Sequence, residues 1–116
     1  MHIEEFRAYC LSKRLVTEEF PFDENTLVFK VCGKIFALTG LEGTDFKVNL
    51  KCDPDKALSL REQYESIIAG FHMNKKHWNT IKVDGSFPDT FFKELIDHSY
   101  DLVVQGLPKK FRDQLL

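Results

Sequence analysis

The sequence predicts a single α+β domain in which helices cover one face of a five-stranded antiparallel sheet. The expected element order is helix, three strands, helix, two strands, helix, and consecutive strands of this kind favour an antiparallel sheet. Residues 45–51 alternate strictly, with Phe46, Val48 and Leu50 on one side. Such alternation indicates a strand with one buried and one solvated face. The length of 116 residues suits one domain, to which we assign residues 1–116.

The first half of the chain is expected to hold one helix and three strands. Ile3, Phe6 and Cys10 recur at helical spacing and predict a helix over about residues 3–15, followed by a loop to residue 26. Two apolar runs, 27–32 and 35–39, flank Gly33-Lys34. A two-residue link that contains glycine is typical of a β-hairpin. The alternating segment 45–51 supplies the third strand.

The second half is expected to hold two helices and two strands. Asp53-Pro54 has the residue types of a helix N-cap and first position, which predicts a helix over 54–68 that Gly70 ends with a left-handed cap. Two strands, 71–73 and 78–84, are expected around a turn at 74–77. A long helix over 88–105 follows, with an inward stripe of Phe92, Leu95, Ile96, Ser99, Leu102 and Val103. Residues 109–116 have the pattern of one more short amphipathic turn.

The composition is that of a folded protein of a reducing compartment. Hydrophobic residues make up 43% and charged residues 29% of the chain. The three cysteines are far apart and form no Cys-x-x-Cys, so we expect reduced thiols. The acidic N-terminus precedes no apolar run, and no stretch approaches the roughly 20 apolar residues of a membrane span. These features predict a cytoplasmic protein without a membrane partner.

Residue spacing gives no support for catalysis, a metal or a cofactor. His72 and His77 are five residues apart across a turn, which is not a ligand spacing. The chain contains no nucleophile elbow, phosphate-binding glycine loop or His-Glu-x-x-His motif. Arg61 and Tyr64 lie on the inner stripe of the second helix, where we expect hydrogen bonds to the sheet, or to Asn74 and His77. The interpretation is a protein that is not an enzyme.

The segment 72–80 concentrates polar and aromatic chemistry. It holds two histidines, two lysines, two asparagines and the only tryptophan. Lysine contacts phosphate, asparagine can pair with adenine, and tryptophan offers a stacking surface. Strand alternation adds a lysine-bearing sheet face that also includes Asn49. The candidate nucleic-acid-binding residues are Asn74, Lys75, Lys76, His77, Trp78, Asn79, Lys82, Lys47, Lys51 and Lys30.

A structural explanation of the same residues competes with the functional one. Antiparallel sheets often present a polar face to water, and a hairpin can carry solvated lysines beside a tryptophan that caps the core. The net charge of −2 also opposes nucleic-acid binding as a default. A mildly acidic protein can nevertheless present a basic face, and the local field then matters more than the total.

Several motifs resemble the MmcQ/YjbR family over almost the whole chain. The most specific is the run from Gly70 to Thr80, Gly-Phe-His-Met-Asn-Lys-Lys-His-Trp-Asn-Thr. The others are Val31-x-Gly33-Lys34-x-Phe36-Ala37, Leu60-Arg61-Glu62-x-Tyr64, Asp84-Gly85, Leu95-Ile96-x-x-Ser99-Tyr100-x-Leu102-Val103 and Leu107-Pro108-Lys109-Lys110. The resemblance implies a fold like that of type III secretion chaperones, and loosely like that of frataxin. It also implies a DNA-binding role, with no agreed catalytic residues.

The sequence therefore leads to one hypothesis and one alternative. The hypothesis is a non-enzymatic DNA-binding module that contacts mainly phosphate through the 74–80 hairpin and the lysine-bearing sheet face. Few basic groups and a negative total charge predict modest, strongly salt-dependent affinity. The alternative is a protein-interaction or chaperone-like module that uses the same face. Salt separates them, because release of counterions from DNA makes its binding steeply salt-dependent.

Overall fold

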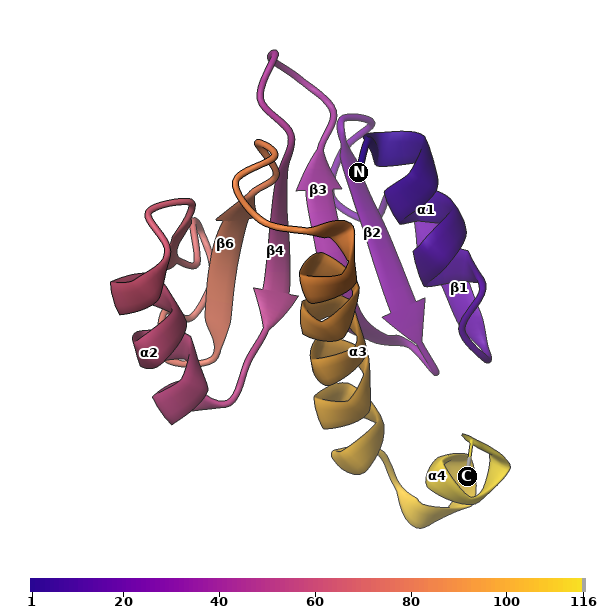
Figure 1. Ribbon diagram of the computed structural model, residues 1–116. Coiled ribbons are helices and arrows are strands. Elements are labelled where there is room, and N and C mark those ends of the chain that lie inside the picture. Colours follow the sequence, from indigo (N-terminus) through magenta and orange to yellow (C-terminus); the bar gives the residue numbers. More distant parts are fainter. Residues whose placement is uncertain (116) are drawn as a thin grey trace.

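The computed structural model describes residues 1–115, which form an antiparallel sheet of six strands with four helices (Figure 1). The strands lie in the order β1-β2-β3-β4-β6-β5, and each neighbouring pair is antiparallel. The elements are α1 (Ile3–Leu11), β1 (Val16–Glu19), β2 (Thr26–Val31), β3 (Lys34–Gly40), β4 (Lys47–Lys51), α2 (Pro54–Gln63), β5 (Ile67–Ala69), β6 (Trp78–Lys82), α3 (Asp89–Gln105) and α4 (Lys109–Leu115).

The α+β class, the position of α3 and the short amphipathic C-terminal element agree with the sequence. The strand count does not, because residues 16–19 were expected to be loop and instead form β1. The segment Val-Thr-Glu-Glu has one apolar residue and two acids, so periodicity alone does not reveal a strand. Its pairing with β2 and an ion pair between Glu18 and Arg7 of α1 hold it at the edge of the sheet.

The two-residue turn of the β2–β3 hairpin lies one residue earlier than predicted, at Cys32-Gly33 instead of Gly33-Lys34. Cys32 and Gly33 both have positive φ, 48° and 80°, so they are the two turn residues and Lys34 begins β3. Paired left-handed residues match the right-handed twist of a hairpin. Phe29 pairs with Ala37 and Lys30 with Ile35, which leaves Phe36 as an extra, bulged residue. Phe36 is fully buried and its ring packs edge-on against Tyr100 of α3.

The helix expected over 54–68 ends at Gln63, and the strand expected at 71–73 lies instead at 67–69. Tyr64 adopts an extended backbone, φ −128°, and its ring stacks on Phe91 and meets the edge of Phe87. This packing carries the chain out of the helix, and Ile67–Ala69 then pairs with β6. Residues 71–73 are turn, and Gly70 follows a strand instead of capping a helix.

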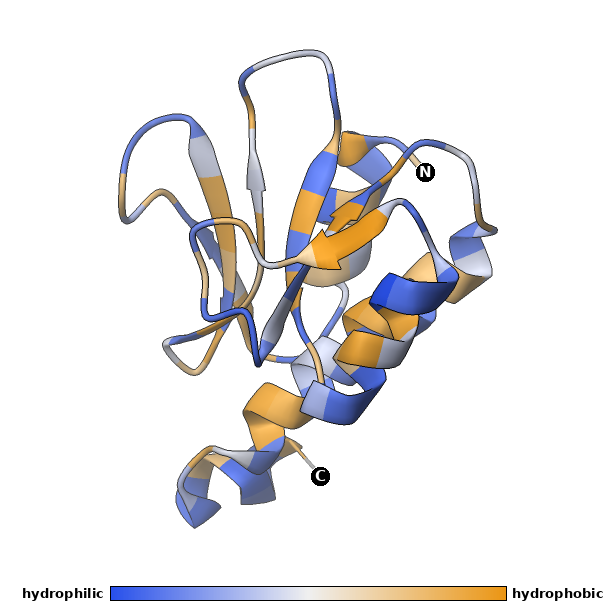
Figure 2. Cartoon of the chain, turned by 90° about the vertical axis from the view of Figure 1, so that its left-hand side faces the viewer, coloured by the Kyte–Doolittle hydropathy of each residue, from blue (hydrophilic) through white to orange (hydrophobic). Residues whose placement is uncertain are grey.

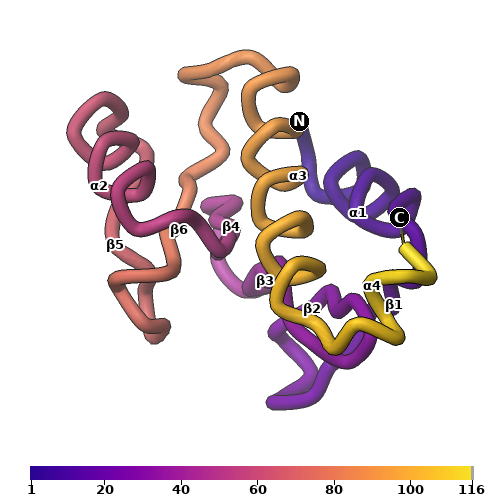
Figure 3. The backbone as a smooth tube through the Cα atoms, turned by 90° about the horizontal axis from the view of Figure 1, so that it is seen from below, coloured from indigo at the N-terminus to yellow at the C-terminus, as the bar shows by residue number. Residues whose placement is uncertain are grey.

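All three long helices lie on the same side of the sheet. Phe6 of α1 contacts the rings of Phe29 on β2 and Phe92 on α3. The view from below shows α1, α2 and α3 on one side, with strands and loops on the other (Figure 3). Hydrophobic stretches concentrate in the strands and along α3, whereas the loops are largely hydrophilic or intermediate (Figure 2). The expected placement of helices on one face is therefore confirmed.

None of the helices in residues 1–115 is long and apolar enough to cross a membrane.

Candidate functional site

The helix-free side of the sheet, here called the open face, carries its side chains in rows that cross the strands. At one end of this face, Lys30 pairs with Ile35 on β2 and β3, and Lys51 pairs with Trp78 on β4 and β6. A third pair on the same face is Lys47 with Lys82. The row between them comprises Glu19, Val28, Leu38, Asn49, Thr80 and Ile68. The register confirms that Lys30, Lys47, Lys51, Trp78 and Lys82 share one face.

Part of the positive charge on the open face is neutralised. Lys30 Nζ lies 3.3 Å from the Glu19 carboxylate, and hydrogen bonds from Thr17 and Lys30 lower the pKa of Glu19. Lys82 Nζ lies 3.8 Å from the Asp45 carboxylate, and both side chains are half exposed. A pair this exposed attracts weakly, because water screens it. Within residues 1–115, Lys47 and Lys51 form no ion pair, so the field of the face rests largely on them.

One hollow lies at the end of the sheet that holds the β2–β3 turn and the start of β6, and we call it the basic groove. It is lined by lysines and aromatic side chains. It encloses about 560 Å³. Lys30, Lys34 and Lys51 line it together with Trp78 and Phe22, and its lining includes no carboxylate. Phe22 is 66% exposed although it is a large apolar side chain. The remaining lining residues are Pro21, Gly33, Ile35, Val103 and Gly106. Charge and ring surface together suit an anionic aromatic ligand.

A second hollow, which we call the mixed groove, has different chemistry. It encloses about 640 Å³. Its lining combines apolar Ile68 and Phe71 with Lys47 and two acids, Glu42 and Asp45. The rest of its lining is Leu38, Thr39, Gly40, Gly43, Thr44, Asn49 and Thr80. The acids oppose a polyanion here, so the two grooves favour different ligands.

The backbone of Phe71 is fixed to the sheet through both its N–H and its carbonyl. Its N–H donates to Thr80 Oγ1 at 2.9 Å, and its carbonyl accepts from Asn49 Nδ2 at 3.2 Å. The Thr80 hydroxyl in turn donates to Asn49 Oδ1 at 2.5 Å. The Phe71 side chain is 63% exposed, and its ring packs against His72. Sequence reasoning missed Phe71, because the expected strand 71–73 hid an isolated aromatic residue after Gly70. The Asn49 amide therefore holds the backbone of Phe71 and the hydroxyl of Thr80 in place.

The two asparagines of the 74–80 segment do not support the predicted pairing with adenine. Asn74 Oδ1 accepts from the Lys76 N–H at 2.9 Å and thereby closes a turn. Asn79 is 2% exposed and faces the helices, where its amide donates to the Ala57 carbonyl at 3.3 Å. It pairs with Leu50 in register, so it belongs to the buried face. We therefore withdraw Asn79 from the candidate set and assign the Asn74 side chain to the turn.

Arg61 orients the segment that leads into Trp78. Its Nε donates to Asn79 Oδ1 at 2.6 Å, and its Nη2 donates to the carbonyls of Trp78 and Lys75. The predicted hydrogen bonding of Arg61 to the sheet is confirmed. Gly70 lies so close that a Cβ there would be 2.8 Å from the Cβ and carbonyl oxygen of Trp78. These contacts hold Trp78 at the basic groove, while Lys75, Lys76 and His77 belong to the loop before it.

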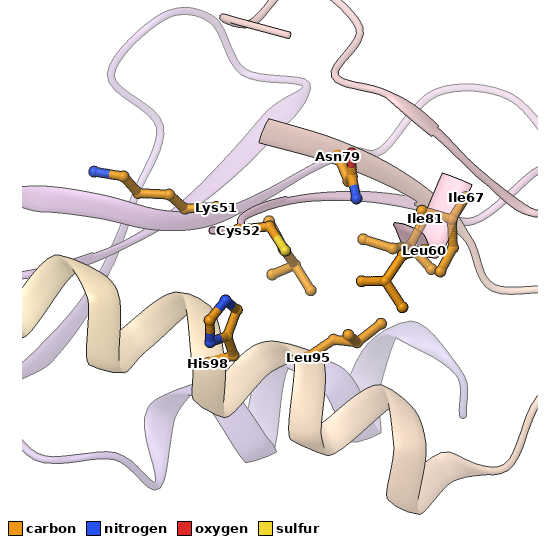
Figure 4. Close-up of a pocket in the computed structure, with 9 residues that line it drawn as sticks. Lys51, Cys52, Leu60, Ile67, Asn79, Ile81, Leu95 and His98 are labelled. Carbon is orange, nitrogen blue, oxygen red and sulfur yellow. The ribbon is translucent and has the colours of Figure 1, made fainter. Parts of the chain in front are cut away.

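The helix side contains a small cavity near Cys52 and His98 (Figure 4). Burial raises the pKa of Cys52 to about 11, so the thiol is protonated at neutral pH. His98 Nε2 accepts from the Asp53 N–H at 3.1 Å, and burial lowers the pKa of this imidazole. Both groups are therefore neutral, and they do not form a thiolate–imidazolium pair. In the part of the chain that the structure describes, no three His, Cys, Asp or Glu residues cluster as metal ligands.

Fold and site together define a small α+β domain with a helix-covered face and an open face that bears lysines and aromatics. The model of the YjbR family matches residues 11–102, and the chain belongs to that family. The Escherichia coli K12 protein YjbR is 34% identical over the whole of this chain and 98% of its own length. The Escherichia coli O157:H7 protein YbdF is 45% identical over 82% of this chain and 76% of its own. The family resemblance in the sequence is confirmed, and neither relative's name states an activity.

Solved structures share the fold. The crystal structure of the Deinococcus radiodurans protein DR2400 aligns with a TM-score of 0.90 at 39% identity, over 97% of this chain and 86% of that one. A Pseudomonas syringae crystal structure aligns with a TM-score of 0.75 at 27% identity, over 88% of this chain and 98% of that one.

Proposed function

We propose that the protein is a non-enzymatic, cytoplasmic DNA-binding module that holds the phosphate backbone against its open face. The observation that carries the proposal is the basic groove, which Lys30, Lys34 and Lys51 line together with Trp78 and which no carboxylate lines. Lysine is a point charge that suits phosphate oxygens without fixing a base sequence. Three unpaired cysteines, Cys10 and Cys52 among them buried, support the reducing location.

The distribution of the charges supports the proposal although the net charge is −2. On the open face the acids Glu19 and Asp45 accompany Lys30 and Lys82, and Asp45 and Glu42 line the mixed groove. In the basic groove, Lys34 and Lys51 form no ion pair within residues 1–115, whereas Lys30 is paired with Glu19. Each lysine that neutralises a phosphate of duplex DNA contributes about 0.9 to the slope of log affinity against log salt. A footprint of a few lysines predicts modest affinity that salt abolishes.

The direct test replaces two groove lysines with glutamine. Lys34 is exposed at the hairpin turn and Lys51 is half-buried on β4, so Lys34→Gln with Lys51→Gln should leave the melting temperature within a few degrees. Anisotropy titrations of a labelled duplex at several salt concentrations should show weaker binding and a slope smaller by about two. Matched control substitutions are Lys56→Gln on α2 and Lys93→Gln near the start of α3, two helix residues that do not line the groove. Equal slopes in the two double variants would remove the support for the proposal.

The loop before Trp78 is a second place to measure. Lys75 and Lys76 are both exposed, and Lys75 Nζ donates to the Gly70 carbonyl at 3.2 Å. Replacing both with alanine should weaken duplex binding uniformly across sequences, with little change in stability. If this variant binds as the wild type does, the loop serves only to position Trp78, and the footprint shrinks to the groove.

A protein-binding or chaperone-like role is the second candidate, favoured by the mixed groove. Ile68 and Phe71 are 52% and 63% exposed there, which is unusual for neighbouring large apolar side chains. An apolar peptide in this groove would bind with a shallow salt dependence, unlike DNA. Phe71→Ala should abolish peptide binding and leave DNA binding unchanged, whereas the Lys34/Lys51 variant should do the reverse.

A further inference from the structure

Building on the proposed function, we infer that the preferred ligand is single-stranded nucleic acid, whose bases stack on Trp78 and Phe22 while Lys30, Lys34 and Lys51 hold its phosphates.

The groove places its charges in a recess. Its lining takes the pair Lys30 and Ile35 from β2 and β3 and the pair Lys51 and Trp78 from β4 and β6, and it continues onto Phe22 in the loop before β2. Its lining also includes Val103 and Gly106, so the groove extends past the ends of the strands to the C-terminal end of α3 on the helix side. Duplex DNA is read by an element that enters a groove of the DNA, such as a helix or a β-ribbon. A recess on a sheet instead accepts a flexible strand.

The aromatic side chains are the second part of the argument. In a duplex the bases are stacked on one another, and their flat faces do not reach protein rings. A single strand splays its bases, and each one offers a face for stacking on an aromatic side chain. Phe22 presents two thirds of its surface, and Trp78 lies beside Lys51 in the sheet register. Lysines interleaved with rings in this groove therefore fit a single strand better than a duplex.

Trp78 is prepared for stacking before any ligand arrives. The contact with Gly70 and the hydrogen bond from Arg61 to the Trp78 carbonyl fix the backbone of Trp78 at the start of β6. Because the backbone of Trp78 is already fixed, little backbone entropy is lost when a base binds there, which favours affinity. Phe22 comes from a loop and contributes the second ring.

The experiment uses Trp78 as its own reporter, because it is the only tryptophan in the chain. Oligothymidylate of about 12 nucleotides, a duplex of the same length and heparin are titrated at low salt. We expect the oligothymidylate to quench the fluorescence of Trp78 and to bind more tightly than the duplex. Phe22→Ala should weaken its binding about tenfold, by the usual loss of one stacked base. Phe20→Ala is the matched control, since Phe20 is 51% exposed in the same loop but does not line the groove.

The outcomes separate this inference from the function on which it rests. If the duplex binds as tightly as the single strand and Phe22→Ala behaves like Phe20→Ala, stacking is wrong and the DNA-binding proposal stands. Quenching by heparin as strong as that by oligothymidylate would show that charge alone perturbs Trp78, and would also refute stacking. If neither nucleic acid binds at low salt, both the inference and the proposed function fail.

Discussion

Replacement of Ser99 by alanine tests the packing of α3 on the sheet, because one buried hydroxyl there joins two strands. Ser99 is 0% exposed. Its Oγ donates to the Phe36 carbonyl at 2.5 Å and accepts from the Lys51 N–H at 2.9 Å. Phe36 is the bulged residue of β3, and Lys51 is the last residue of β4, so the ladder between the two strands does not satisfy these groups.

The magnitude follows from the two backbone groups that the substitution leaves without a partner. A buried polar group that loses its hydrogen bond costs about 1–3 kcal/mol. Alanine gains slightly in helix propensity over serine, by a few tenths of a kcal/mol. We therefore expect Ser99→Ala to lower the free energy of unfolding by about 2–4 kcal/mol, a large share of the total stability of a small domain.

Urea denaturation followed by circular dichroism measures this change, with Ser59→Ala on the exposed surface of α2 as the control. Amide exchange adds a local readout, since the Lys51 N–H should lose protection before the amides of the β2–β3 pairing. A loss of less than about 0.5 kcal/mol, the usual range for a surface substitution, would refute the reasoning. Such a result would mean that the Lys51 N–H and the Phe36 carbonyl do not depend on the Ser99 hydroxyl for a hydrogen bond.

Three further predictions address the surroundings of Trp78 and the helix side. Gly70→Ala should cost about 1–3 kcal/mol and shift the emission of Trp78, because its Cβ needs space that Trp78 occupies, whereas Gly40→Ala, with open space around it, should not. Arg61→Lys should cost about 1–3 kcal/mol in urea denaturation, since an ammonium cannot reproduce the fork that serves several acceptors. Because the pKa of His98 is lowered in the folded protein, the unfolded chain binds a proton at this imidazole more readily. The contribution of neutral His98 to stability is therefore present above about pH 6.5 and is lost as pH falls through the folded pKa. Denaturation midpoints from about pH 7.5 to about pH 5 should therefore depend less on pH in His98→Gln than in the wild type.

Several features of the site could be predicted because they depend only on local periodicity. Alternation along β4 and β6 correctly placed Lys47, Lys51, Trp78 and Lys82 on one face, since successive strand residues point to opposite sides. The stripe of α3 was likewise correct at Ser99, which is buried as expected. Both patterns are properties of a single element, so they can be read without knowing its neighbours.

Other features of the site could not be predicted, because they arise between segments far apart in the chain. Asn79 falls in the same strand as Trp78, yet only the packing of α2 shows that its amide is consumed by Arg61 and the Ala57 carbonyl. The ion pairs of Lys30 and Lys82 depend on Glu19 and Asp45, which come from a strand and a loop that the pattern does not connect to them.

The sequence by itself determined the class of fold, the family and the polar composition of one sheet face. The tertiary structure decided the sixth strand, the early end of α2 and the division of the open face into a basic and a mixed groove. The physical reason is the distance along the chain over which each interaction acts. Side-chain period and turn chemistry act over a few residues, whereas edge pairing, ring packing such as that of Tyr64 on Phe91, and the compensation of charges require residues that only folding brings together.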